Sequence, residues 1–367
     1  MLIAVDAREL CGRPTGVGRY LASLLAEWHR TAGAHEIRLY APSAPALPHG
    51  VTMAVRLVPG GRGTWWEQRQ LPAALAGDRP DVLFAPAYTA PIWTEVRVVV
   101  TIHDLSFVAH PEWFSWREGA RRRLVTRLAA RRAAAVITVS AFSQREIVER
   151  FHLPASRVHV VPSGIPGPAG AAPSGSHTAG GPRVLFVGSI FNRRHVPELI
   201  RAFAPVARAD RDARLDLVGE NRTHPPQDLG ALAASLGISP QVLVRSFVPD
   251  AELAALYAGA RAFAFLSEYE GFGFTPLEAL SAGVPIVVLD TPVAREIYGA
   301  AALYVRLGDE AGCTEAMRAL LYDEAARAAI LQAAPAVLAR YSWTRAAEET
   351  LGVLVQAATR PMRRSGA

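Results

Sequence analysis

Short, continuous apolar runs alternate with amphipathic helical segments along most of this sequence. The runs 2–7 (LIAVDA), 81–87 (DVLFAPA) and 134–140 (AAVITVS) lack the polar alternation of a strand with one solvated face. They indicate strands that are covered on both sides, as in a parallel sheet between layers of helices. The helical segments 17–30 and 116–133 supply the crossovers that parallel strands need. The alternation therefore predicts an α/β fold.

The same alternation begins again in the second half of the chain. We expect strands there at 183–189, 214–220, 242–247, 260–267 and 284–290. Between the halves, residues 164–182 are rich in Gly, Pro, Ala and Ser, which is typical of a linker. A chain of 367 residues also exceeds what one hydrophobic core usually supports. The sequence therefore predicts two Rossmann-like domains that face a cleft.

The basic residues are all of one kind, since the 39 of them are arginines and the sequence has no lysine. Chemistry that depends on a lysine, such as a Schiff base or a P-loop, is thereby excluded. Arginine binds phosphate with two parallel hydrogen bonds. The formal net charge of +6 suits phosphorylated or anionic-lipid partners, and we expect no nucleic acid partner.

Two cysteines, Cys11 and Cys313, lie far apart and match no metal-binding spacing. They indicate a reducing compartment rather than a disulfide framework. The opening MLIAVDAREL has no basic region before a long apolar run, so it is expected to be a buried strand and not a signal peptide. No run approaches the roughly 20 apolar residues of a membrane span. These features predict a cytoplasmic protein, with the cytoplasmic face of the membrane as the alternative.

Two glutamates bracket a glycine-aromatic turn in residues 268–280, EYEGFGFTPLEAL. One interpretation is a capping box, with Thr275 as the N-cap, Pro276 at the first helical position and Glu278 reaching back. It does not account for Glu270. The other interpretation is a ligand site, because the segment joins the end of an apolar strand to a helix. Glycines admit a close approach, helix-opening N–H groups suit a phosphate, and carboxylates suit sugar hydroxyls. Both interpretations stay open.

The segment EGFGFTPLEALSAGVPIV resembles the E-x7-E signature of the retaining glycosyltransferases of family 4, which have the GT-B fold. Other segments resemble the same family in the same order: TGVGRY (15–20), VVVTIHDLSFVAHPEWF (98–114), VITVSAFSQREI (136–147), VHVVPSG (158–164), VLFVGS (184–189) and SFVPDAELAALYAGARAF (246–263). Within that family, the chain resembles the mannosyltransferase-like members.

The resemblance implies a role for each part of the chain. Residues 1–165 would form the acceptor-side domain, 166–182 the linker and 183–340 the nucleotide-sugar domain. Residues 341–367 would form a C-terminal helix that crosses back to the first domain and ends in a frayed tail. The donor would be a nucleotide-diphosphate sugar, and the acceptor a saccharide, a lipid-linked glycan or a small molecule.

The resemblance also implies roles for single residues. Glu270 would contact sugar hydroxyls near the reacting carbon, and Glu278 would hold the ribose hydroxyls. The amides over the sugar and diphosphate would be those of Phe272, Gly273, Phe274 and Thr275.

The family commonly has a basic pair that clamps the diphosphate, and here Arg193 and Arg194 match it. Two solvated loop arginines are the alternative. Ser189 stands where the family commonly has an arginine, and this departure puts one phosphate contact in doubt.

Two further segments lie at expected strand ends. The family places the glycine loop, here Gly16, Val17 and Gly18, against the diphosphate and the acceptor; a tight turn with close helix packing is the alternative. His103 would lie near the transferred sugar and bond the sugar or the acceptor. Asp104 would orient His103 or cap the next turn.

The helix expected at 116–133 carries a dense set of arginines. A solvated helix face is the favoured interpretation, and peripheral association with an anionic membrane is the alternative. The arginines are Arg121, Arg122, Arg123, Arg127, Arg131 and Arg132. The tryptophans at 65, 66 and 93 are expected in the core or in the wall of the acceptor cleft. The Asp-Arg-Asp run at 210–212 is expected to be a surface turn and not a metal site.

These observations predict a retaining glycosyltransferase that moves a hexose from a nucleotide-diphosphate sugar, with GDP-mannose favoured, to an acceptor hydroxyl. It would act in glycan, polysaccharide or glycoconjugate biosynthesis. The predicted catalytic residues are His103, Glu270 and Arg194, and no metal or other cofactor is expected. The alternatives are a sugar-nucleotide epimerase of GT-B fold and a non-catalytic two-domain sugar-binding protein.

Overall fold

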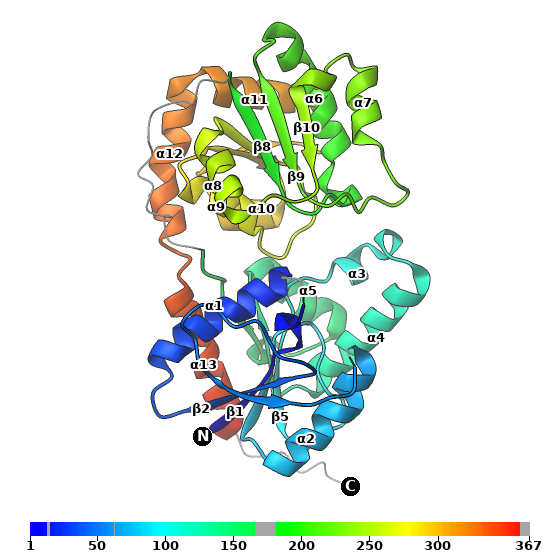
Figure 1. Cartoon of the computed structure of the whole chain (residues 1–367), viewed down its shortest axis with the longest axis vertical. Coiled ribbons are helices and arrows are strands. Elements are labelled where there is room, and N and C mark those ends of the chain that lie inside the picture. Colours follow the sequence, from blue (N-terminus) through cyan, green and yellow to red (C-terminus); the bar gives the residue numbers. More distant parts are fainter. Residues whose placement is uncertain (13–14, 62, 166–180, 360–367) are drawn as a thin grey trace. The chain divides into compact units, whose positions relative to one another are not determined.

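The computed structural model of the chain describes residues 1–12, 15–61, 63–165 and 181–359 (Figure 1). The chain divides into two compact units: unit 1 is Met1–Gly164 with Tyr341–Ala367, and unit 2 is Ile165–Arg340. Most of the expected linker and the expected frayed tail lie outside the described residues. The end of that linker, 181–182, already packs on unit 2, where the Pro182 carbonyl accepts a hydrogen bond from the Arg214 N–H at 2.9 Å.

Within its described residues, unit 1 has a seven-stranded parallel sheet in the order β3-β2-β1-β4-β5-β6-β7. The strands are β1 (Leu2–Asp6), β2 (Glu36–Ala41), β3 (Ala54–Leu57), β4 (Val82–Ala85), β5 (Arg97–Thr101), β6 (Ala135–Thr138) and β7 (Val158–Val160). The helices are α1 (Gly16–Thr31), α2 (Leu71–Asp78), α3 (Ser106–Ala109), α4 (Trp116–Arg132), α5 (Ala141–Phe151) and α13 (Trp343–Thr359). Single turns are η1 (Arg8–Leu10), η3 (Pro111–Trp113) and η4 (Ala155–Arg157), and η2 (Trp66–Gln70) is a π-helix.

The described part of unit 2 has a six-stranded parallel sheet in the order β10-β9-β8-β11-β12-β13. The strands are β8 (Arg183–Val187), β9 (Arg214–Val218), β10 (Val242–Arg245), β11 (Ala262–Phe265), β12 (Ile286–Leu289) and β13 (Ala302–Val305). The helices are α6 (Val196–Ala209), α7 (Leu229–Ser235), α8 (Asp250–Gly259), α9 (Phe274–Ser281), α10 (Pro292–Tyr298), α11 (Glu310–Tyr322) and α12 (Glu324–Leu338), with the turns η5 (Asn192–Arg194) and η6 (Ser239–Gln241).

The core of unit 1 lies on both faces of its sheet, because successive side chains of a strand point to opposite faces. Ile3 and Val5 of β1 belong to a cluster that includes residues of α1 and α13, whereas Ala4 belongs to a second cluster with residues of α2, α4 and α5. Figure 1 shows α13 beside α1, and the Trp28 indole donates a hydrogen bond to the Ala347 carbonyl at 2.9 Å. The C-terminal helix therefore completes the core of unit 1.

Both sheets have a point at which the chain reverses its direction of travel across the sheet. In unit 1 this point lies between β1 and β4, and in unit 2 it lies between β8 and β11. Loops that leave the carboxyl ends of these two neighbouring strands go to opposite sides, which is where open α/β sheets bind ligands. The topology thus predicts ligand sites at the loops that follow β1, β4, β8 and β11.

Across the described ranges, no helix is both long enough and apolar enough to cross a membrane. Cys11 and Cys313 are both free thiols and both buried.

Candidate active site

The loops after β8 and β11 meet at the switch point of unit 2. The β8 loop carries Ser189 and η5, and the β11 loop runs from Leu266 to Gly273. The Glu268 N–H donates a hydrogen bond to the Arg193 carbonyl at 3.0 Å, so the two loops are joined through their backbones. Residues that lie far apart in the sequence are thereby brought together.

Arg194 and Glu270 form the central contact between these loops. Arg194 Nε donates to Glu270 Oε1 at 3.0 Å, and Nη2 lies 2.9 Å from the same oxygen. The Ser267 hydroxyl also donates to Glu270 Oε1, at 2.9 Å. The arginine and glutamate side chains are only 14% and 18% exposed. Two residues predicted to be catalytic, an arginine and a glutamate, thus lie in direct contact at the edge where open α/β sheets bind ligands.

The path of the Arg194 side chain explains the glycine at position 188. A Cβ on Gly188 would lie 2.5 Å from Arg194 Nη1, and Gly188 has φ of +142°. The guanidinium then passes over the Phe265 ring, with Cζ 4.9 Å from the ring centroid. Ser189 accepts a hydrogen bond from Arg194 Nη1 at 2.8 Å through its backbone carbonyl. The residue that departs from the family pattern therefore holds the neighbouring arginine.

Arg193 points toward a different partner. Its Cζ lies 4.6 Å from the centroid of the Phe191 ring. Such stacking leaves the edge of a guanidinium available for hydrogen bonds.

The glycine-aromatic turn opens α9, but not as a capping box. The helix begins at Phe274, its N-cap is Gly273 with φ of +87°, and no side chain caps it. Thr275 and Pro276 are therefore the second and third helical residues, and the capping interpretation of Glu278 is wrong. The reason is local: Gly273 can adopt the left-handed conformation, which starts the helix two residues earlier.

Gly273 is fixed by a tyrosine of α10. The Tyr298 hydroxyl donates to the Gly273 carbonyl at 3.0 Å, and a Cβ on Gly273 would lie 2.0 Å from that hydroxyl. Gly273 and Phe272 are buried, whereas Phe274 and Thr275 are partly exposed. Tyr298 thus holds the backbone of the turn in place. The first N–H groups of α9 lie at the same edge of the sheet as Arg194.

Glu278 lies one turn further along α9 and is partly exposed. The Tyr257 hydroxyl of α8 donates to Glu278 Oε2 at 3.2 Å. Because Glu278 is not a cap residue, helix capping does not explain why a carboxylate stands at this position. A tyrosine that orients a partly exposed carboxylate is consistent with a hydroxyl-binding group.

The two glycines of the first loop differ in what surrounds them. Thr15 is the N-cap of α1, and its hydroxyl accepts from the Gly18 N–H at 2.9 Å. A Cβ on Gly18 would lie 2.7 Å from the Glu9 carbonyl, whereas a Cβ on Gly16 would meet no atom within 4 Å. Gly18 is therefore explained by helix packing, while the exposed Gly16 and the partly exposed Val17 stay available to a ligand.

His103 lies at the carboxyl end of β5 between two tyrosine rings. Its centroid is 4.9 Å from that of Tyr20 and 5.4 Å from that of Tyr88. Nε2 lies 2.9 Å from the Pro86 carbonyl, and burial lowers the pKa of the His103 imidazole. A neutral ring that donates from Nε2 presents Nδ1 as an acceptor for a hydroxyl.

Asp104 has taken the second of the two roles expected for it. It accepts from the Ser106 N–H at 2.8 Å and from the Tyr88 hydroxyl at 2.8 Å. Asp104 therefore caps the following turn and holds Tyr88 against the His103 ring.

A buried ionic cluster at the end of β1 was not expected from the sequence. Arg8 Nε lies 3.3 Å from Asp6 Oδ2, and Arg8 Nη2 donates to Glu67 Oε1 and, at 3.1 Å, to the Thr89 hydroxyl. Burial raises the pKa of Asp6 to about 6, against the attraction of Arg8. Glu67 comes from the π-helix η2, a rare element that often marks functional sites. No sequence motif joins these residues. The pairing of β1 with β4 brings Arg8 beside Thr89, and Glu67 reaches them from η2.

The tryptophans of unit 1 separate into core and surface. Trp66 is fully buried, but Trp65, Trp93 and Trp116 are 64%, 72% and 78% exposed. Of the two positions expected for these rings, the core is therefore wrong for Trp65 and Trp93 and right for Trp66. The three exposed rings lie near α4. Trp116 is its first residue, and Arg132 of α4 has its Cζ 3.9 Å from the centroid of the Trp93 ring. Trp65 follows Thr64, whose hydroxyl accepts a hydrogen bond from Arg121 of α4 at 2.6 Å.

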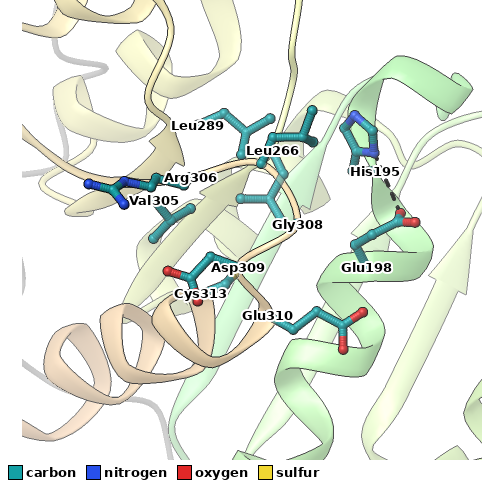
Figure 2. A pocket seen from close by; sticks show the side chains of 11 residues that line it. His195, Glu198, Leu266, Leu289, Val305, Arg306, Gly308, Asp309, Glu310 and Cys313 are labelled. Carbon is teal, nitrogen blue, oxygen red and sulfur yellow. Dashed lines mark ion pairs between the residues drawn. The ribbon is translucent and has the colours of Figure 1, made fainter.

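A small hollow lies beside the unit 2 site (Figure 2). Apolar side chains of Leu266, Leu289 and Val305 line it, and His195 and Glu198 face each other across its rim. It contains no residue to which the sequence assigned a role.

The Asp-Arg-Asp run follows α6 in a surface turn, where Asp210 Oδ2 accepts from the Tyr322 hydroxyl at 2.9 Å. In the part of the chain that the structure describes, no three His, Cys, Asp or Glu side chains are grouped so as to hold a metal ion.

Comparisons with known proteins agree with this arrangement. Residues 14–166 match the family model Glycosyltransferase Family 4, and residues 173–337 match the model Glycosyl transferases group 1. O-antigen chain mannosyltransferase B of Escherichia coli is 27% identical over 263 residues, which cover 70% of this chain and 69% of that protein. D-inositol 3-phosphate glycosyltransferase of Nocardia farcinica is 31% identical over 280 residues, which cover 70% of this chain and 60% of that protein.

Solved structures show the same fold. The crystal structure of Anabaena Alr3699/HepE in complex with UDP-glucose aligns with a TM-score of 0.73 at 20% identity, over 96% of this chain and 99% of that one. With the two family models, this likeness settles the classification. The chain belongs to the family 4 glycosyltransferases and has their GT-B fold.

Proposed function

We propose that this glycosyltransferase moves a hexose from a nucleoside-diphosphate sugar to a saccharide or lipid-linked acceptor, with retention of the anomeric configuration and without a metal ion. GDP-mannose is the favoured donor, because O-antigen chain mannosyltransferase B is a relative. That relative also supports a role in polysaccharide biosynthesis. The observation that carries the proposal is the Arg194–Glu270 pair at the start of α9.

Each group at the unit 2 switch point suits one part of such a donor. Arg194, Arg193 and the N–H groups of α9 are donors for a diphosphate, whose charge grows as it leaves. Glu270 suits the sugar hydroxyls, and Glu278 the ribose hydroxyls. Arginines then supply the charge stabilisation that a divalent metal would otherwise give.

The contacts of Glu270 favour attack by the acceptor over a covalent intermediate. Its Oε1 accepts from Arg194 and from Ser267, and a carboxylate so engaged is a weak nucleophile. We infer that the acceptor oxygen attacks C1 on the face from which the diphosphate departs. The C1–O bond to the phosphate breaks, the bond to the acceptor forms, and the hydroxyl proton passes to the departing phosphate oxygen. His103 would orient a hydroxyl through Nδ1.

Calorimetric titration with GDP, UDP, ADP and dTDP tests the donor site. We expect one nucleotide to bind to the wild type and binding to weaken in Glu278→Ala. Glu315→Gln is the control, because Glu315 is an exposed residue of α11 that pairs with Arg318. Absence of binding to the wild type, or equal affinity in Glu278→Ala, would contradict the proposal.

The products separate the remaining alternatives. Transfer with retention gives a glycoside whose anomeric proton coupling matches that of the donor, and it should persist in EDTA. Donor that is isomerised without an acceptor would indicate an epimerase instead. Binding without turnover for any acceptor would indicate a sugar-binding protein.

We further propose that the exposed tryptophan–arginine surface of α4 docks on anionic lipid. Trp65, Trp93 and Trp116 are amphipathic rings of the kind that lie at lipid headgroups, and arginines surround them. The guanidinium of Arg132 lies over Trp93, and that of Arg69 lies over Trp65, with Cζ 5.7 Å from the ring centroid. Such a surface would hold the enzyme where lipid-linked acceptors are found.

Sedimentation with vesicles tests this surface. We expect the protein to bind vesicles of phosphatidylcholine with phosphatidylglycerol, more weakly at high salt, and not vesicles of phosphatidylcholine alone. Trp65→Ser with Trp93→Ser should reduce binding, while the control Leu307→Ser, an exposed apolar residue of unit 2, should not. Equal binding to both vesicles, or by both variants, would overturn the assignment.

A further inference from the structure

His195 is held between two carboxylates at the start of α6. Its Nε2 lies 3.1 Å from Glu268 Oε2, and its Nδ1 lies 3.7 Å from Glu198 Oε2 (Figure 2 shows the second pair). His195 has φ of +46°, a region in which Asn, Asp and His are the favoured residues other than glycine. Its side chain is 20% exposed. The ring therefore lies within ion-pair distance of both carboxylates, on a backbone conformation that suits histidine.

The two carboxylates lie on different segments. Glu198 is on the first turn of α6, whereas Glu268 is on the β11 loop, two residues before Glu270. Residues 193–195 thus meet residues 268–270 three times: Arg193 through the backbone, Arg194 through its ion pair and His195 through Glu268. We call these contacts between residues 193–195 and 268–270 the junction. The His195–Glu268 contact is the part of the junction that lies nearest to α6.

The surroundings of the ring favour its charged form. Burial alone would lower the pKa of His195, but the Glu198 and Glu268 carboxylates outweigh burial and raise the pKa above its usual value. The same pairing with His195 lowers the pKa of Glu198 to about 2. The elements around the ring carry further charged groups, among them Arg193, Arg194, Glu270, Arg201, Arg306, Asp309 and Glu310.

We propose that His195 is a positioning residue of sugar transfer, whose imidazolium holds the β11 loop against the start of α6 and so keeps Glu270 in register with Arg194. This inference rests on the proposed function. Loss of the ring proton removes the attraction to both carboxylates and loosens the junction. A small misplacement of reacting groups is costly in rate.

The sign of the pH effect follows from the raised pKa of His195. Below the ordinary pKa of histidine the ring is charged in every state, and its contribution to the junction is complete. The contribution is lost as the pH rises through the raised pKa. Transfer should therefore weaken on the alkaline side of that pKa.

Rate profiles test the positioning role. We expect kcat/KM of the wild type to fall on an alkaline limb. In His195→Asn, which tolerates the left-handed backbone but cannot carry the charge, kcat/KM at pH 7 should be about 10- to 100-fold lower, and this limb should be absent. Glu268→Gln should also lower kcat/KM, and it should move the alkaline limb to lower pH rather than abolish it, because His195 keeps its ring and loses one of its two carboxylates. His49→Asn and Glu315→Gln change exposed side chains and should keep the wild-type profile. A wild-type rate or an unchanged alkaline limb in His195→Asn overturns the proposal.

A second readout separates this inference from the proposed function. The imidazole resonances of ¹⁵N-labelled protein report the pKa of His195 whether or not transfer occurs. Glu268→Gln should lower that pKa, and Glu315→Gln should leave it unchanged. If the pKa does not respond to Glu268→Gln, the junction is overturned even in an active enzyme. If it responds but the wild type binds no sugar nucleotide, the proposed function fails, and the role of His195 in transfer fails with it.

Discussion

Arg194 Nη2 lies 2.9 Å from Glu270 Oε1. The two residues are on loops that are far apart in the sequence but adjacent in the structure, because β8 and β11 are neighbours in the sheet. A guanidinium has five N–H donors, so Arg194 can bind a diphosphate while it stays bound to Glu270. The pair therefore links the two ends of the scissile bond in the proposed reaction: a carboxylate at the sugar and a cation at the leaving group.

Arg194→Ala should lower kcat/KM for transfer by on the order of 100-fold, because one preorganised donor to the developing charge is lost. Arg194→Lys should retain part of the rate, since it keeps the charge but loses the planar fork. Steady-state kinetics with the donor identified by titration measure both. Arg318→Ala, which removes an exposed arginine of α11, is the control and should leave the rate near that of the wild type. Equal rates for Arg194→Ala and the control would contradict the role.

Gly16→Ala and Gly18→Ala should separate binding from packing in the first loop. A Cβ at Gly18 would lie 2.7 Å from a backbone carbonyl, and such overpacking costs about 1–3 kcal/mol. A Cβ at Gly16 has open space around it. We expect Gly18→Ala to lower the unfolding temperature of unit 1, and Gly16→Ala to leave it unchanged while it slows transfer. Intrinsic fluorescence measures unit 1 alone, because all seven tryptophans lie in it.

Most of the strands that the sequence located have both faces buried, and β10 is an exception with partly exposed side chains. β1, β8 and β12 consist of apolar runs with buried side chains, and all three were expected. β3 is an edge strand with exposed side chains, so it has no continuous apolar run. β2, β13, α2, α10 and α12 were also not expected. The first four are short, whereas α12 has 15 residues, mostly alanine and other apolar residues, that do not mark out one apolar face.

The candidate site shows a similar division. The position of the strand–loop–helix junction at Glu270 follows from local pattern, but the start of α9 does not. It depends on the left-handed backbone of Gly273 and on Tyr298, which is distant in sequence. The Arg194–Glu270 pair depends on which strands are neighbours, and the Arg8–Glu67 pair depends on the packing of η2 at the end of β1. Sequence spacing alone carries no information on either.

Asp6 should titrate near pH 6 in the folded protein. Burial raises its pKa to about 6, Arg8 opposes this and the Glu67 charge adds to it. Glu67→Gln should therefore lower the pKa of Asp6, and ¹³C carboxyl NMR measures it.

Because the folded pKa of Asp6 exceeds its usual value of 3.8, its contribution to the free energy of unfolding is complete below that value and is lost as the pH rises through about 6. Unfolding followed by tryptophan fluorescence should therefore show that the ionisation of Asp6 makes unit 1 less stable above about pH 6. An Asp6 midpoint at the usual value, or one that Glu67→Gln raises, would contradict the assignment.

Leu354→Ala should destabilise unit 1 although residue 354 lies far along the chain from the rest of it. Leu354 of α13 is fully buried in the cluster that contains Ile3 and Trp28, and removal of such a side chain costs about 2–5 kcal/mol. Urea unfolding followed by tryptophan fluorescence should show a lower midpoint. Gln356→Ala, an exposed position on the same helix, is the matched control. Met317→Ala empties a buried position of unit 2 and should change the circular-dichroism transition while leaving the fluorescence midpoint in place. If Leu354→Ala unfolds at the midpoint of the wild type, α13 does not contribute to the core of unit 1.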